Sequence, residues 1–314
     1  MSTATDERGR FGHAPDSPTK LARGEWIDVF KRSGAQFLAD DCMGLSQAVA
    51  YSSMLAFFPA VIFLLGLLGT FHLYGSFESF IATIAPHGVI KFINGLQKDS
   101  HGGAGVTAFI VGFFAAVWAA SGAMGTVMKA VNRAYERPET RPFWKVRLIA
   151  IVLVSLNGLV LAGLVVLIVF GGPLGDAIAS KAGLGGAFKV VWNVLRWPIT
   201  FGAVLLFFAF VYYLAPNKPQ RNWKWISPGS LVGSLLWLAL SALFALYVTF
   251  AGSYSKTYGT LASGIILLLW LNYSAFALLY GAELNSELDR QADIRAAGGP
   301  DAGLVKPARR ATTR

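Results

Sequence analysis

The fold is decided by the stretch LLLWLNYSAFALLYGAELNSELDR, residues 267–290, in which the first charged side chain is Glu283. The uncharged run reaches back to Thr257 and ends at Ala282. As a helix rising about 1.5 Å per residue it would be about 39 Å long, which exceeds the roughly 30 Å of hydrocarbon in a bilayer. The run therefore predicts a transmembrane helix, with Glu283 at the boundary of the membrane rather than at its centre.

Five further windows lack Asp, Glu, Lys and Arg: 42–77, 100–128, 148–175, 197–217 and 225–255. The 314-residue chain is 54% hydrophobic and 14% charged, a composition typical of integral membrane proteins. Because these runs are continuous and do not alternate as barrel strands do, they favour helices. We predict an all-α, polytopic membrane protein with a six-helix domain at 46–288 and spans at about 47–71, 105–128, 148–171, 197–215, 228–250 and 258–282.

The segments outside the spans differ in character. Residues 1–20 and 289–314 are polar and aperiodic, which predicts disordered cytoplasmic tails. Residues 21–41 place Trp26, Val29 and Phe37 at helical spacing, which predicts an amphipathic interfacial helix; a soluble helix packed on the protein's own loops is the alternative. Two short amphipathic patterns around residues 86–88 predict an outer helical hairpin that lies in the interface or caps an outward-facing cavity.

The distribution of Lys and Arg predicts the topology. With the N-terminus inside, the inner segments hold 21 of the 27 basic residues and the outer segments five, with Arg196 at the outer start of the fourth span. Cytoplasmic flanks retain positive charge, so both termini are expected in the cytoplasm. The net charge of +10 then fits attraction to an anionic inner leaflet. No basic stripe on a soluble domain is interleaved with aromatic residues, so no nucleic-acid partner is expected.

The sequence offers no arrangement for catalysis. The four histidines are scattered singly, without the spacing of a zinc site, and no phosphate-binding loop is present. The single cysteine, Cys42, is read as a small apolar residue near a helix start. We therefore expect no enzymatic activity, no catalytic residue, no metal and no cofactor.

Polar side chains at membrane depth are the candidates for a functional site, because they are costly unless they are paired or face water. Gln47 and Tyr51 lie four apart at the start of the first span, and Asn157 lies deep in the third. Asn272 and Glu283 share one stripe of the sixth helix, with Tyr280 beside them. Substrate contact and interhelical hydrogen bonding are both open for each group. We expect Glu283 to pair with Lys129 or Arg133, as a structural lock or as a gate.

Several stretches resemble the YihY/virulence factor BrkB family, once labelled ribonuclease BN. They are AVAYSSMLAFFPAVIFLLGLLG (48–69), VWAASGAMGTVMKAVNRAYE (117–136), YYLAPNKPQRNWKWISPGSLVGSLLW (212–237) and YVTFAGSYSKTYGTLASGIILLLWLNYSAFALLYGAELNSEL (247–288). The resemblance implies a bacterial inner-membrane protein with six helices and cytoplasmic termini. It also implies transport or export of a lipid-like or amphiphilic compound. The chain departs from the family pattern at residues 52–54, where it has Ser-Ser-Met.

The leading hypothesis is a plasma-membrane protein that moves an amphiphilic solute through an intramembrane cavity. The residues expected to line this cavity or its gate are Glu283, Asn285, Tyr280, Asn272, Tyr51, Gln47 and Asn132. The expected partners are the lipid bilayer and an unidentified amphiphilic solute, and a homo-oligomer is left open. The alternative is a membrane scaffold that recruits partners through its cytoplasmic segments. A ribonuclease is disfavoured because the sequence offers no site for it.

Overall fold

The computed structural model describes residues 23–70, 104–169, 180–181, 186–218, 227–250 and 260–298. Its labelled elements are all helices: α2 (Arg23–Ala39), α3 (Cys42–Thr70), α6 (Ala104–Ala134), α7 (Phe143–Val169), α9 (Gly186–Leu214), α10 (Pro228–Phe250) and α12 (Thr260–Gly298). All but α2 are long and apolar enough to cross a membrane. The predicted all-α architecture with six candidate spans is confirmed for these residues. The predicted outer hairpin and the tail at 1–20 lie outside them.

Two helices exceed their predicted bounds. α9 begins at Gly186 rather than near 197, and α12 runs on to Gly298. Residues 289–298, assigned to a disordered tail, are therefore helical, which corrects that boundary. In both places a charged residue ended the apolar window that was used for the prediction. Lys, Arg, Gln, Leu and Ala are nevertheless good helix formers, so a helix continues past the end of its apolar part.

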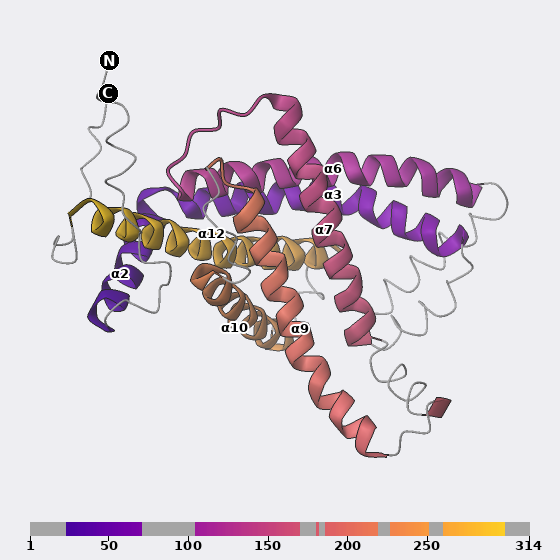
Figure 1. The fold of residues 1–314 in the computed structure, drawn as a ribbon. Helices are drawn as coiled ribbons and strands as arrows, with labels where there is room; N and C mark the ends of the chain where they lie inside the picture. The colour runs from indigo at the N-terminus through magenta and orange to yellow at the C-terminus, as the bar shows by residue number, and fades with distance from the viewer. Residues whose placement is uncertain are drawn as a thin grey trace.

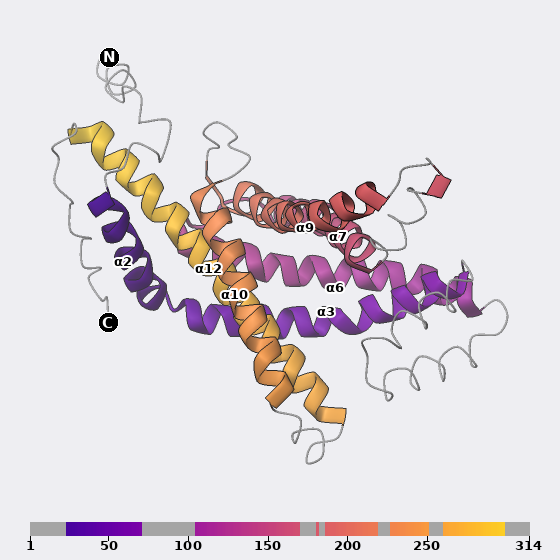
Figure 2. The same cartoon turned by 90° about the horizontal axis from the view of Figure 1, so that it is seen from below.

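α12 is the central helix of the fold. It contacts α3, α10, α2 and α6, and Figure 2 shows it running between α2, α10 and α3. One third of the residues in its apolar window are buried (33%), against 11–22% in the other five spans. The many apolar side chains left exposed on the outer helices suit a surface that faces lipid.

Four of the remaining helices form two pairs. α3 and α6 run side by side in both views (Figures 1 and 2) and are antiparallel, since Ser52 hydrogen-bonds Thr126 over 3.0 Å and Gly112 lies against the backbone of Phe63. α7 and α9 pack on each other and cross these helices steeply in the view of Figure 1. α3 remains one continuous helix through Pro59.

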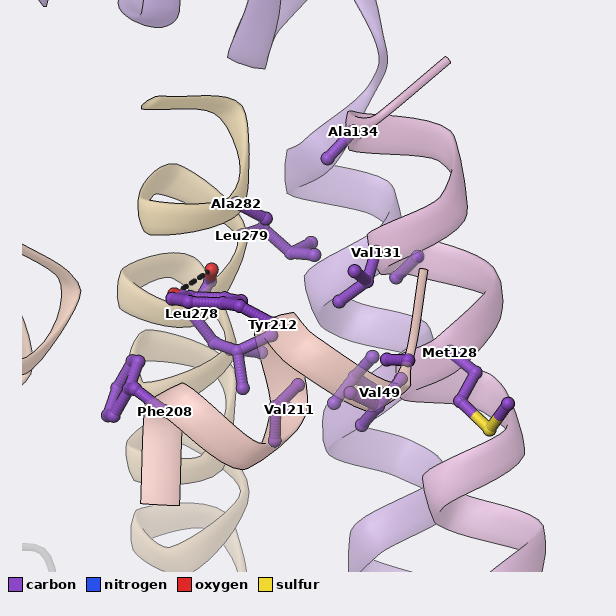
Figure 3. Packing of buried hydrophobic residues seen from close by; sticks show 14 of the residues in the cluster. Val49, Met128, Val131, Ala134, Phe208, Val211, Tyr212, Leu278, Leu279 and Ala282 are labelled. Carbon is purple, nitrogen blue, oxygen red and sulfur yellow. Dashed lines mark hydrogen bonds between the residues drawn. The ribbon is translucent and has the colours of Figure 1, made fainter. Parts of the chain in front are cut away.

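The core lies where these pairs meet α12. Figure 3 shows Val131 of α6 facing Leu279 of α12; Val211 of α9 belongs to the same cluster, and all three side chains are fully buried. The Tyr212 hydroxyl donates to the Leu278 carbonyl oxygen over 2.7 Å, which ties α9 to α12 at the same level. The packing therefore fixes the rotation of α12 relative to α9 and α6.

α2 lies along the second half of α12. Val29 and Ser33 are buried in this contact, and the Phe37 ring meets the rings of Phe276 and Tyr280 at centroid distances of 5.9 and 6.2 Å. The turn at residues 40–41 then leads into α3. We call the region around this turn, where α6 and α9 end and α10 begins, the α2 end of the bundle.

α10 and α12 approach most closely at Gly229 and Gly281. A Cβ atom on Gly229 would collide with the Gly281 carbonyl oxygen and the Asn285 amide, and one on Gly281 would collide with the Tyr212 hydroxyl. Small residues let helix backbones approach in lipid, where packing contributes much of the attraction between helices. These two glycines are therefore required by the contact itself.

Replacing Gly229 with Ala is expected to destabilise the protein, because the colliding atoms belong to a neighbouring backbone that cannot move aside locally. Overpacking costs about 1–3 kcal/mol in typical cores, and a backbone collision lies at the upper end of that range. Thermal unfolding in detergent measures the effect. Gly158→Ala on α7 is the control, since its Cβ would meet open space. Equal melting temperatures for the two variants would contradict the required contact.

Candidate functional site

Glu283 is buried between α12 and the start of α3, with 1% of its surface exposed. The Cys42 thiol donates to Glu283 Oε1 over 3.3 Å. The predicted ion pair with Lys129 or Arg133 is wrong: Lys129 and Arg133 lie on the exposed side of α6, and Arg133 Nε instead lies 3.2 Å from Asp40 Oδ1. The carboxyl group of Glu283 therefore has a thiol, not a cation, as its hydrogen-bonding neighbour within the described part of the chain.

Asn285 joins α12 to the start of α10. Its Oδ1 accepts the Gly229 backbone N–H over 2.8 Å, and its Nδ2 donates to the Ser227 hydroxyl over 2.9 Å. The first N–H groups of a helix have no partner within that helix, so Asn285 satisfies one of them from outside. Ser227 also accepts the Ser230 backbone N–H over 3.1 Å, which makes it the N-cap of α10.

Asn132 joins the end of α6 to the segment that follows α9. Its Oδ1 accepts the Asn217 backbone N–H over 2.7 Å, and its Nδ2 donates to Glu139 Oε2 over 2.8 Å. Arg141 closes the arrangement, because its guanidinium binds Glu139 and also donates to the Ala215 carbonyl oxygen over 2.8 Å. The loop between α6 and α7 therefore caps the last turn of α9.

Glu139 lies in this loop, outside the spans. Hydrogen bonds from Arg141 are the main cause that lowers the pKa of Glu139 below its ordinary value, with a smaller contribution from Asn132 and against the opposing effect of partial burial. A lowered carboxyl pKa means that the folded state favours the charged form. The ionised Glu139 is thus part of the loop's fixed geometry.

Lys218, in the segment after α9, contacts both α12 and the residue that follows α6. Lys218 Nζ lies 2.6 Å from Asp289 Oδ2 and 4.2 Å from the centre of the Tyr135 ring. Burial, and then the charge of Asp289, raise the pKa of Tyr135 well above its ordinary range, so its hydroxyl stays neutral. This side of the loop is therefore held by a cation placed between an aromatic ring and a carboxylate.

α2 completes the cluster through its polar face. Arg32 Nη1 lies 3.4 Å from Glu287 Oε1, and Gln36 Nε2 donates to Glu136 Oε1 over 2.7 Å. Together these contacts join α2, α3, α6, α9, α10 and α12. We call them the α2-end polar cluster, and its residues are Cys42, Asn132, Glu139, Arg141, Asn217, Ser227, Glu283 and Asn285, with the ion pairs around them.

The structure brings only some of the predicted residues together. Glu283, Asn285 and Asn132 lie within the α2-end polar cluster, and Tyr280 lies beside it, half-buried against Phe37 of α2.

The other three predicted residues lie elsewhere. Asn272 lies deeper along α12, and its buried Oδ1 has no hydrogen-bond partner among the described residues. Gln47 and Tyr51 lie on the exposed side of α3, where 62% of the surface of Tyr51 is accessible. Their predicted role in lining a cavity stays a prediction.

Five members of the cluster were not selected as site residues from the sequence: Cys42, Glu139, Arg141, Asn217 and Ser227. A usable signal exists for Glu139 and Arg141, because they lie between Pro138 and Pro142 in a short charged turn that links two apolar helices. For Cys42 no sequence signal exists, since its partner lies 241 residues away in the chain.

A second feature is an apolar cavity between α7 and α9, with a volume of about 340 Å³. Its lining residues are all aliphatic or glycine: Leu159, Val160, Gly163, Leu164, Leu167, Ile199, Ala203 and Leu206. It lies away from the α2-end polar cluster, along the later part of α7. Such a lining can hold a hydrocarbon chain but offers no side chain that could hydrogen-bond a ligand. In the described residues, no group of three or more His, Cys, Asp and Glu side chains is placed to hold a metal ion.

Replacing Asn285 with Ala is expected to lower stability, because the Gly229 N–H and the Ser227 hydroxyl each lose a partner. Unsatisfied buried groups cost about 1–3 kcal/mol each. Thermal unfolding of the purified protein in detergent would show this loss as a lower melting temperature. Ser286→Ala, next to it on α12 and half-buried, is the control expected to leave the melting temperature nearly unchanged. A similar shift for both variants would argue against the bridging role of Asn285.

Glu139→Gln is expected to destabilise the protein in a pH-dependent way. Because the folded state lowers the pKa of Glu139, its charge contributes stability that is fully present above the ordinary value of 4.5 and is lost as the pH falls through the lower folded value. The gap in melting temperature between wild type and variant should therefore be widest near neutral pH and close in acid. A gap that stays constant down to acid pH would mean that the charge of Glu139 is irrelevant.

Comparison with known proteins agrees with this architecture. The model of the family described as virulence factor BrkB matches residues 34–304. The ribonuclease-like protein YfkH of Bacillus subtilis is 30% identical over 84% of this chain and 96% of its own length.

Two further relatives, both described as UPF0761 membrane proteins, are more distant. Mpe_A1422 of Methylibium petroleiphilum is 26% identical over 82% of this chain, and the match covers 61% of that protein. NT05HA_1801 of Aggregatibacter aphrophilus is 23% identical over 76% of this chain. No solved structure matches. The match to most of the chain shows that this membrane protein belongs to the virulence factor BrkB family.

Proposed function

We propose that this protein moves an amphiphilic, lipid-like solute, whose apolar part occupies the cavity between α7 and α9. The cavity is the observation that carries the proposal. Its volume of about 340 Å³ falls within the roughly 300–1,000 Å³ of ordinary ligand sites. Its wholly aliphatic lining suits a hydrocarbon chain and not a polar metabolite.

The α2-end polar cluster supports the same proposal by closing the bundle on one side. Its hydrogen bonds and ion pairs tie six helices together and bury Glu283, Asn285 and Asn132. A solute in the α7–α9 cavity would therefore be separated from the solution at this end. From the placement of Lys and Arg we propose that the α2 end faces the cytoplasm of a bacterial cell, across the plasma membrane.

The proposed role needs no chemical step. Binding and release of a solute depend on burial of its apolar part, at about 25 cal/mol per Å² of apolar surface removed from water. YfkH is described as ribonuclease-like, and we do not transfer this description to the present chain. We propose that the present chain acts as a non-enzymatic membrane protein.

Filling the cavity tests the proposal. Gly163 lines it, and a Cβ on this residue would meet nothing within 4 Å, so Gly163→Leu adds apolar volume at the cavity wall without a collision at Cβ. The measurement is movement of fluorescent acyl glycerols and phospholipids between the leaflets of liposomes that contain the purified protein. We expect the variant to lose most of the protein-dependent rate.

Gly158→Leu is the matched control. It makes the same substitution on the same helix, at a glycine that is likewise exposed and has open space around its Cβ, but Gly158 does not line the cavity. Its rate should equal that of wild type. Equal rates for both variants, or a wild-type rate no higher than that of empty liposomes with every probe, would refute the proposal.

A further inference from the structure

Asn157 is the one residue of α7 with an amide side chain and lies 14 residues from the first residue of that helix, Phe143. Its side chain is 3% exposed. Neither its Oδ1 nor its Nδ2 has a hydrogen-bond partner among the residues that the structure describes. Asn132 and Asn285, at the α2 end, use both ends of their amides. The amide of Asn157 is thus a complete and unused pair of donor and acceptor groups inside the membrane.

An unused amide in hydrocarbon is costly. Transfer of such a group from water without a compensating hydrogen bond costs roughly 2–7 kcal/mol, depending on the reference state. In a bilayer, a polar side chain at this depth normally binds another helix, and it marks a functional position when it does not. Asn157 makes no such bond within the described helices, and both atoms of its amide are buried, so a bound molecule would have to enter the packing around it to supply the missing partner.

Asn157 is not itself a lining residue of the α7–α9 cavity, but it lies about one turn of α7 before the lining residue Val160. Val160 and Leu164, both lining residues, follow it by three and seven residues, which places all three on the same side of α7. They lie about 4.5 and 10.5 Å further along the helix axis. A hydrocarbon chain in the cavity would therefore bring the group at its end next to Asn157.

We propose that Asn157 binds the uncharged, hydrogen-bonding headgroup of an amphiphile whose chain lies in the α7–α9 cavity. This inference rests on the proposed function and adds the class of headgroup, a hydroxyl or an amide. The amide of Asn157 donates and accepts, which complements either group. A charged headgroup is disfavoured because no lining residue of the cavity carries a charge and a lone charge in hydrocarbon is far more costly than a neutral polar group.

Asn157→Leu tests the inference, because it keeps the branching of the side chain and removes the amide. The probes are a fluorescent monoacylglycerol and its analogue with both hydroxyls capped as methyl ethers, bound to the purified protein in detergent. Wild type should prefer the hydroxyl-bearing probe by about tenfold, the equivalent of one hydrogen bond. Asn157→Leu should lose this preference and melt at the same or a higher temperature, since an unsatisfied polar group has been removed. Ser155→Leu, an exposed polar residue of the same helix, should keep the preference.

The second test uses the wild-type protein, so its result does not depend on how a variant folds. A monoacylglycerol with a photoreactive group at its head should label α7 around Asn157, and one with the group at the end of its chain should label α7 or α9 near the lining residues. Peptide mapping by mass spectrometry locates the labels. Head labels confined to the α2 end would overturn the inference. So would an unchanged preference in Asn157→Leu.

The two proposals fail in different ways. If Gly163→Leu stops movement of the acyl probes while Asn157→Leu keeps the preference for hydroxyls, the cavity serves the solute and Asn157 does not. If the uncapped and capped probes bind wild type equally but both are moved, the headgroup assignment fails and the proposed function stands. If wild type neither binds nor moves any probe, the proposed function itself fails.

Discussion

The close approach of α10 and α12 at Gly229 and Gly281 is the contact on which the α2 end depends. It brings the start of α10 within hydrogen-bonding distance of Asn285, one turn further along α12. Because residues two apart on a helix point about 200° from each other, Glu283 then faces the opposite side and enters the interface with α3. One turn of α12 thus contacts α10 through Asn285 and α3 through Glu283. A side chain at either glycine would push α10 away from α12 and so disturb the contact with Asn285.

The sequence predicts the spans well and the partners poorly, for physical reasons. Exclusion of charge from long windows follows from the cost of charges in lipid, so six helices can be found without knowing how they pack. Helical periodicity also places Asn272 and Glu283 on one stripe. It does not say which neighbour that stripe meets, and the partner of Glu283 proved to be Cys42. Arg133, which the sequence places at a similar depth in the membrane to Glu283, lies on the other side of α6 and pairs with Asp40.

The sequence also does not show which neighbour Gln47 and Tyr51 meet, which explains why they were selected as cavity residues. Both are polar or amphipathic and lie near the start of α3, which made them candidates, yet the phase of α3 turns them outward. Helix ends are misjudged for a different reason, because a hydropathy window stops at the first charges whereas helix propensity does not. For this reason the prediction missed the last ten residues of α12, 289–298. The cap on α9 by Arg141 depends on a loop that folds back from another helix, which no local pattern encodes.

The polar groups of the protein divide into two sets. Those at the α2 end are paired with one another, and the region is bound together by hydrogen bonds that fix the rotation of each helix. Within the membrane, the hydroxyl groups of Ser52 and Thr126 are paired, but the amides of Asn157 and Asn272 keep buried atoms without partners among the described residues. A fold stabilised mainly through one end can tolerate such groups at moderate cost, because the packed end does not depend on them.

This asymmetry also bears on how a solute would reach the cavity. The last turn of α9 is held by Tyr212, Arg141 and Asn217, whereas near its start Val190, Val191 and Val194 are about two-thirds exposed. α9 is therefore anchored at the α2 end and loosely packed at the other. Separation of α7 from α9 at the loose end breaks few contacts, while separation at the α2 end breaks a connected set of hydrogen bonds. The least costly route into the cavity is thus sideways from the lipid, between α7 and α9, and this is the route that a molecule already dissolved in the bilayer would take.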